Sequence, residues 1–136
     1  MNLKIAAVFT VVLGTSLAAF AADASKLPPA SDKKGVTFEK DIKPIFDHSC
    51  IKCHGEERAK AHLKLTTLEG VLKGSEDGKV VEPGKSDKSD LVFSVAHVGD
   101  PDTFMPPTKA KKGTPIPPLT KDEVGLIRAW IDQGAK

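Results

Sequence analysis

Residues 50–54 of the chain read Cys-Ile-Lys-Cys-His, and this short run has residue types suited to covalent cofactor chemistry. Cys50 and Cys53 are three positions apart, so both thiols can reach one planar ring from a single turn of chain. Each thiol can form a thioether with one vinyl group of a porphyrin, and the adjacent His54 can then bind the iron. The motif therefore predicts attachment of one c-type haem, and the chain has no further cysteine.

The same spacing also occurs in thiol–disulfide redox motifs, structural disulfides and zinc sites. A redox motif needs a thioredoxin-like βαβ context, which the residues around Cys50 do not show. A tetrahedral zinc site needs well-spaced ligands, whereas the candidate ligands here crowd into the positions from His48 to His54. Haem attachment is the interpretation that we favour, and these alternatives stay open.

The second axial position of such an iron needs a methionine sulfur or a histidine nitrogen. Met105 is the only methionine apart from Met1, and prolines follow it at positions 106 and 107. Each proline fixes φ and removes an amide donor, which stiffens a non-helical loop around the sulfur. We predict His54 as the proximal iron ligand and Met105 as the distal ligand, with His97 as the alternative distal ligand.

The amino terminus has the pattern of an export signal. Lys4 precedes an apolar run over residues 5–13, and Ala-Phe-Ala at 19–21 fits a cleavage site. An uncleaved membrane anchor is the alternative, but the apolar run is short and ends at Gly14. The pattern predicts a signal peptide over 1–21 cut after Ala21, a periplasmic or otherwise exported protein, and no membrane span in the mature chain.

Removal of that segment leaves 115 of the 136 residues, enough for one domain with a modest core. The formal net charge falls from +2 to +1, because the removed segment contains one lysine and no acidic residue. A nearly neutral chain argues against nucleic acid as a partner, which requires a basic face. Aromatic residues are few, so a covalently held porphyrin would add much of the apolar volume of the core.

Several amphipathic segments are expected to position the candidate ligands. Apolar residues at 38, 42, 45 and 46 predict a helix leading into Cys50, and Pro44 predicts that this helix kinks or starts there. Residues 63–65 alternate apolar and polar types, which favours a short extended piece. Residues 22–36 are small, polar and proline-bearing, so we expect a flexible lead-in before a domain that spans 37–136.

Two capping boxes mark further helices. Thr66 with Glu69 predicts a short helix that ends near position 74, and Thr120 with Glu123 predicts the last helix, ending near Gly134. Residues 80–84 form a strand-like run into a turn, and residues 89–96 favour another helix. The apolar stripe of the last helix should dock against the helix that leads into the cysteines.

These segments together resemble the planctomycete-type cytochrome c domain, a branch of the class I-like c-type cytochromes. The haem motif is common to all c-type cytochromes, whereas the Pro-Gly turn, Met-Pro-Pro and Trp-Ile-x-x-Gly together are specific to this branch. Residues 61–63 depart from it, since Ala-His-Leu stands where the family often has Gly-Gly-Leu. The matching segments are 38–46, 50–55, 63–65, 80–86, 105–107 and 119–135.

The resemblance implies an all-α, small cytochrome c-like helical fold around one covalently bound haem c, with short extended segments and long loops. It also implies covalent attachment at Cys50 and Cys53, and axial ligation by His54 and Met105. The expected function is single-electron transfer between redox partner proteins, without enzymatic activity. The alternative is a haem-based sensor or peroxidase-like enzyme with an open or displaceable sixth iron site.

A basic cluster follows the predicted distal ligand. Lys109, Lys111 and Lys112 lie in a loop bounded by glycine and proline. If Met105 binds the iron, these lysines lie near the haem edge and could steer an acidic redox partner. The alternative is that they only keep the loop solvated.

Overall fold

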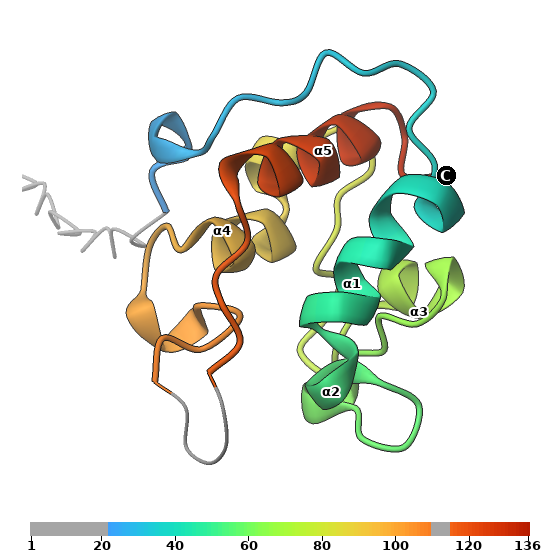
Figure 1. The fold of residues 1–136 in the computed structure, drawn as a ribbon, viewed down its shortest axis with the longest axis vertical. Helices are drawn as coiled ribbons and strands as arrows, with labels where there is room; N and C mark the ends of the chain where they lie inside the picture. The colour runs from blue at the N-terminus through green and yellow to red at the C-terminus, as the bar shows by residue number, and fades with distance from the viewer. Residues whose placement is uncertain (1–21, 110–114) are drawn as a thin grey trace, which may run out of the picture.

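Five α-helices joined by long loops make up the computed structural model, which describes residues 22–109 and 115–136 (Figure 1). Within those residues there is no strand, and the prediction of an all-α fold is confirmed. The predicted signal peptide, Lys111 and Lys112 lie outside the described residues. The helices are α1 (Lys43–Ser49), α2 (Ile51–His54), α3 (Leu68–Lys73), α4 (Asp90–Ala96) and α5 (Lys121–Asp132).

Helix α5 begins and ends as its sequence predicts. The Thr120 hydroxyl accepts a hydrogen bond from the Glu123 N–H at 3.2 Å, and the Glu123 carboxylate accepts one from the Thr120 N–H at 2.7 Å. This reciprocal capping box satisfies two amides that the first turn leaves free. At the other end Gly134 has φ 102°, and its N–H donates to the Ile131 carbonyl at 2.9 Å. The glycine allows the left-handed turn that closes the helix.

The helix that leads into Cys50 starts with a wide turn. Residues Phe38–Ile42 form a π-helical turn, and α1 follows with Pro44 in its first turn. Pro44 has no N–H to give to a carbonyl four residues back, whereas the Lys43 N–H donates to Phe38, five residues back. The structure thus combines the two predicted outcomes at Pro44, since the helix changes its winding there and its α-helical part starts there.

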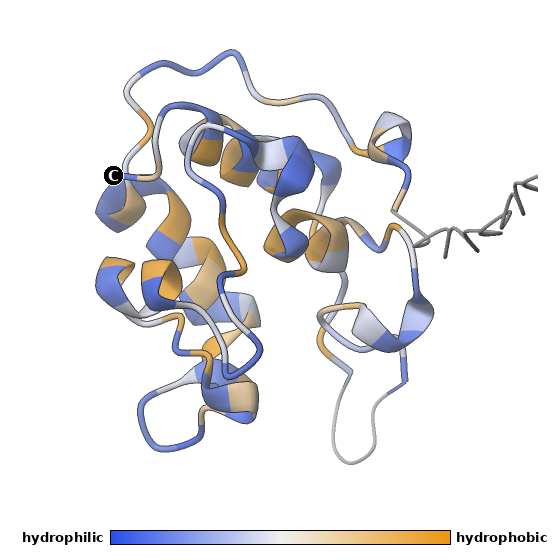
Figure 2. Cartoon of the chain, turned by 180° about the vertical axis from the view of Figure 1, so that it is seen from behind, coloured by the Kyte–Doolittle hydropathy of each residue, from blue (hydrophilic) through white to orange (hydrophobic). Residues whose placement is uncertain are grey.

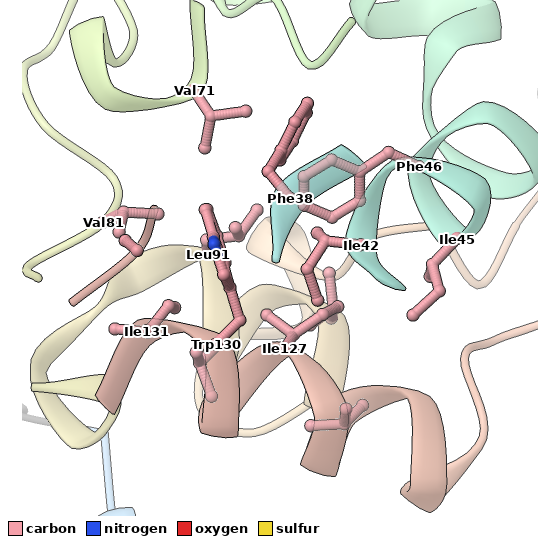
Figure 3. Packing of buried hydrophobic residues seen from close by; sticks show 14 of the residues in the cluster. Phe38, Ile42, Ile45, Phe46, Val71, Val81, Leu91, Ile127, Trp130 and Ile131 are labelled. Carbon is pink, nitrogen blue, oxygen red and sulfur yellow. The ribbon is translucent and has the colours of Figure 1, made fainter. Parts of the chain in front are cut away.

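The hydrophobic core lies where α5 crosses this helix (Figure 3). The rings of Phe38 and Trp130 are 5.8 Å apart, and Phe46 meets Phe38 edge-on at 6.1 Å. Ile42 and Ile127 are fully buried beside them. The indole N–H of Trp130 donates to the carbonyl of the last residue at 3.0 Å, so its one polar atom is satisfied. The predicted docking of α5 is confirmed.

Two local predictions were wrong. The cap of α3 is Thr67, whose hydroxyl accepts from the Gly70 N–H at 3.1 Å, while the neighbouring Thr66 hydroxyl donates to Glu56. Residues 80–84 form no strand, and the Val80 carbonyl instead accepts from the Leu91 N–H at the start of α4 at 3.0 Å. The turn predicted at the end of this run is present, since the Lys85 N–H donates to the Glu82 carbonyl at 2.9 Å and Gly84 has φ 83°. Figure 2 shows apolar residues gathered in the helices, while the loop that follows α2 is hydrophilic.

The segment 22–36 packs along α5 and does not hang free (Figure 1). The Ser31 N–H donates to the Gly125 carbonyl at 2.9 Å, and the Gln133 side-chain amide donates to the Lys33 carbonyl at 2.9 Å. Gly125 allows this approach, because a Cβ there would lie 2.8 Å from the Pro29 carbonyl oxygen. These contacts differ from the flexible lead-in that composition suggested, because its polar backbone finds partners on α5. The domain boundary at residue 37 stays a prediction.

Candidate cofactor site

Both cysteines and His54 lie on one tight turn at the end of α1. Cys50 joins α1 to α2: its N–H donates to the Phe46 carbonyl at 2.8 Å, and its own carbonyl accepts from the Cys53 and His54 N–H groups at 3.0 and 2.9 Å. Both thiols are free and half-buried, and His54 is 9% exposed. The turn therefore holds two thiols and an imidazole as one rigid group.

The imidazole of His54 is oriented by the segment that follows the motif. Its Nδ1 lies 3.3 Å from the Leu63 carbonyl oxygen, and the Leu65 N–H donates to the His54 carbonyl at 2.9 Å. A carbonyl oxygen only accepts, so Nδ1 carries the proton and Nε2 keeps its lone pair. This is the tautomer that a histidine needs to bind a metal through Nε2.

Burial shifts the pKa of His54 and that of Cys50 in the direction that favours the uncharged side chain. Burial lowers the pKa of His54, although hydrogen bonds to the Leu63 and Lys60 carbonyls act in the opposite direction. Burial, together with the neighbouring Cys53, raises the pKa of Cys50 to about 12. A thiol–disulfide catalyst needs a thiol with a lowered pKa. The environment of Cys50 therefore argues against the redox-motif alternative.

Met105 lies in a loop anchored to α4. A 3₁₀ turn over Pro101–Thr103 precedes it, and the Met105 N–H donates to the Ser94 carbonyl in the last turn of α4 at 3.0 Å. The Met105–Pro106 peptide is cis. Ser94 was not among the predicted site residues, because its contribution is a backbone carbonyl that any residue type could provide.

The predicted ligands all line one cavity of about 170 Å³. Cys50, Cys53 and His54 line it from the turn at the end of α1, and Met105 lines it from its loop. Figure 1 shows α2 and the segment 100–109 near the same end of the molecule, away from α5. The remaining wall is mostly apolar and includes Leu63, Leu65, Val80, Leu91, Val95, Pro106 and Ile116.

A second cavity of about 710 Å³ shares part of this lining, including Cys53 and Met105, and opens toward solvent. Three exposed lysines line it, and we call them the basic rim: Lys52, Lys60 and Lys109. Asp102 is the one acidic side chain among its described lining residues. One edge of the candidate site is therefore bordered by positive charge.

His97, the alternative distal ligand, is engaged elsewhere. Its Nε2 lies 3.0 Å from the Pro106 carbonyl oxygen, and its ring stacks on Phe104 at 4.7 Å. Met105, and not His97, is among the described residues that line the cavity with the cysteines. The arrangement therefore favours Met105 over His97 as the second predicted ligand at this cavity.

An all-helical fold with two thiols, an imidazole and a thioether around one mostly apolar cavity is typical of c-type cytochromes. Residues 50–109 match a family model described as Planctomycete cytochrome C. This match supports a planctomycete-type cytochrome c domain in this part of the chain, and such a domain suggests haem-based electron transfer. No curated protein and no solved structure matches the chain.

Proposed function

We propose that this protein is a monohaem c-type cytochrome that carries single electrons between redox partner proteins outside the cytoplasm. In this proposal Cys50 and Cys53 hold one haem c covalently, His54 is the proximal iron ligand and Met105 is the distal ligand. The observation that supports it best is that these four side chains line one cavity, although Met105 is far from the others in the sequence.

The cavity wall suits a porphyrin. Leu63, Leu65 and Leu91 line the cavity with apolar side chains that would contact a bound porphyrin, and His54 shares this lining with its Nδ1 already bonded. Apolar walls exclude water, which lowers the local dielectric constant and disfavours the extra charge of the oxidised iron. The wall would therefore both bind the cofactor and tune it.

The bound haem supplies a one-electron couple between ferric and ferrous iron. The chain's own residues would orient the two iron ligands and so tune the reduction potential. The Leu63 carbonyl fixes the tautomer and direction of the His54 ring, and the prolines at 106 and 107 restrict the backbone that holds the Met105 thioether. A neutral methionine ligand raises the reduction potential relative to a second histidine.

With His54 and Met105 as its ligands the iron would have no open site for a substrate, so we infer a carrier and not an enzyme. In the alternative, a sensor or peroxidase-like enzyme, Met105 would be displaced and the sixth site would open. His97 would be a poor distal acid–base group there, because its Nε2 is bonded to the Pro106 carbonyl. The contacts of the Met105 loop therefore favour the carrier.

Export and partner choice follow from the same proposal. A signal peptide over 1–21 would deliver the chain outside the cytoplasm, where haem c is attached to reduced thiols. The basic rim borders the open edge of the site, so an acidic redox partner is favoured.

If the partner is acidic, the rate of electron exchange with it should fall as ionic strength rises. Changing Lys52, Lys60 and Lys109 together to Gln should remove most of this dependence on salt.

The experiment that tests the proposed function is a spectroscopic redox titration of the holoprotein purified from the periplasm. The expected result is a low-spin spectrum in both oxidation states, the charge-transfer band of an iron–methionine bond in the ferric state, and one Nernstian one-electron transition. A high-spin ferric spectrum that shifts with added cyanide would instead support the open-site alternative.

A further inference from the structure

One side chain contacts both neighbours of Met105. The imidazole of His97 stacks on the ring of Phe104, with centroids 4.7 Å apart and planes 5° from parallel. Its Nε2 lies 3.0 Å from the carbonyl oxygen of Pro106. Phe104 and Pro106 directly precede and follow Met105 in the chain. The residue that presents its thioether to the cavity is therefore flanked on both sides by contacts to one imidazole.

The direction of the hydrogen bond is set by its partner. The Pro106 carbonyl oxygen only accepts, so the His97 Nε2 carries a hydrogen and donates it. Prolines 106 and 107 have no N–H, which leaves this stretch few donors of its own. The Met105 N–H donates to the Ser94 carbonyl at 3.0 Å. The loop is thus bonded to the end of α4 on both sides of the thioether.

We call the two contacts of His97 to the Met105 loop the clamp. The backbone of His97, from which they are made, is itself well anchored. His97 ends α4 in a left-handed conformation, with φ 54° and ψ 46°, and its N–H donates back to the Phe93 and Ser94 carbonyls. Histidine adopts this conformation more readily than most residues. Val92 and Val95 of α4 are buried in the core. The backbone that carries the imidazole is therefore anchored to α4 and, through α4, to the core.

We propose that His97 is a positioning residue, which holds the Met105 loop against α4 so that the thioether stays directed at the cavity. This inference rests on the proposed function. A thioether is a weak ligand, and a loop that is already ordered loses less entropy when it binds. Without the clamp, Met105 leaves the iron more often and an external ligand competes better for the sixth position.

The test compares variants of the ferric holoprotein, with imidazole as the competing ligand. His97→Asn keeps a residue that tolerates the left-handed conformation but is too short to reach Pro106. His97→Phe retains an aromatic ring for the stack and removes the donor. One hydrogen bond and one aromatic contact together correspond to about a tenfold change in an equilibrium constant. We therefore expect imidazole to bind about tenfold more tightly to His97→Asn, and less than tenfold more tightly to His97→Phe.

The matched control is His62→Asn. His62 also has a left-handed φ, 57°, but it is exposed and lies outside the lining of the haem cavity. This variant should bind imidazole as the wild type does. The iron–methionine band provides a second readout that a merely structural role would not move: it should disappear at a lower temperature in His97→Asn, while the global unfolding midpoint changes little.

The outcomes separate this inference from the proposed function. If Met105→Ala loses the iron–methionine band while His97→Asn matches the wild type in imidazole affinity and in the thermal loss of that band, the clamp is overturned and the proposed function stands. If Met105→Ala retains the wild-type spectrum and His97→Asn loses it, His97 is itself the ligand. That result overturns both the clamp and the proposed ligation.

Discussion

The two ends of this molecule are closed in different ways. At the end formed by α5, Phe38, Phe46 and Trp130 fill the interior with their own side chains and are at most 1% exposed. At the other end, Cys50, His54 and Met105 line a cavity that shares part of its lining with a larger one. Tight packing by protein atoms stabilises the first end, whereas the second retains space that protein atoms do not fill. This difference fits the proposal that a haem completes the second end, which we call the cofactor end.

The two ends also differ in their secondary structure. The α5 end consists of a long capped helix with its apolar stripe on the core. The cofactor end consists of the short helix α2 and loops. Left-handed φ values occur at both ends, since Ala61 and His97 have 52° and 54° at the cofactor end and Ala135 has 53° after α5. Backbone strain of this kind persists where surrounding contacts hold it, and it is common at functional sites. Four predictions test this comparison.

The largest effect is expected from removal of both thiols. Cys50→Ala with Cys53→Ala should give protein without covalent haem, and the apoprotein should lose its cooperative fold because the cofactor end stays unfilled. Cys53→Ala alone should retain haem through one thioether at most. Haem staining of denaturing gels and the dispersion of NMR spectra are the measurements. Lys52→Ala is the control within the motif. Wild-type staining in the double variant would disprove the attachment sites.

A large effect is also expected at the packed end. Trp130→Ala should lower the free energy of unfolding of the holoprotein by about 3–5 kcal/mol, because it empties a fully buried site. Denaturant titration measures this change, and Leu126→Ala, at a half-buried position of the same helix, should cost less. The absorption spectrum of the molecules that remain folded should stay that of the wild type. A shifted spectrum would show that the two ends are not independent.

An intermediate effect is expected at the distal ligand. Met105→Ala should retain covalent haem but lose the iron–methionine band and lower the reduction potential, because the thioether favours the ferrous state. Spectroscopic redox titration measures both. The unfolding free energy should change less than in Trp130→Ala, since Met105 lies at the cavity and outside the packed core. A wild-type spectrum and potential would exclude Met105 as the ligand.

The smallest effect is expected from relief of backbone strain. Ala61 has φ 52°, a conformation that costs an L-residue about 1–2 kcal/mol. Ala61→Gly should therefore stabilise the holoprotein, by about 0.5–1 kcal/mol after the larger entropy of glycine in the unfolded chain is deducted. The control is Ala59→Gly, where φ is −113° and only the entropy term applies, so this variant should be destabilised. Denaturant midpoints compare the two, and equal signs would contradict the strain argument.

Sequence reasoning was most successful where the signals are local. The caps of α5 depend on residues within one turn of each end, so Thr120, Glu123 and Gly134 could be recognised without the fold. The cap of α3 shows the limit of such signals. Thr66 and Thr67 are adjacent and of the same type, and the fold gives the cap to Thr67 because Thr66 bonds to Glu56 instead.

The sequence by itself determined the chemistry that this protein has available. Two thiols and a histidine within five residues, one methionine beside two prolines, and helical stripes of apolar residues are all properties of short stretches of chain. Only the tertiary structure decided which of these stretches meet. It brings Met105 to the same cavity as His54, engages His97 with the Met105 loop, and lays residues 22–36 along α5. The physical reason is that these contacts join groups from different elements and loops, beyond one turn of chain, so no local pattern encodes them.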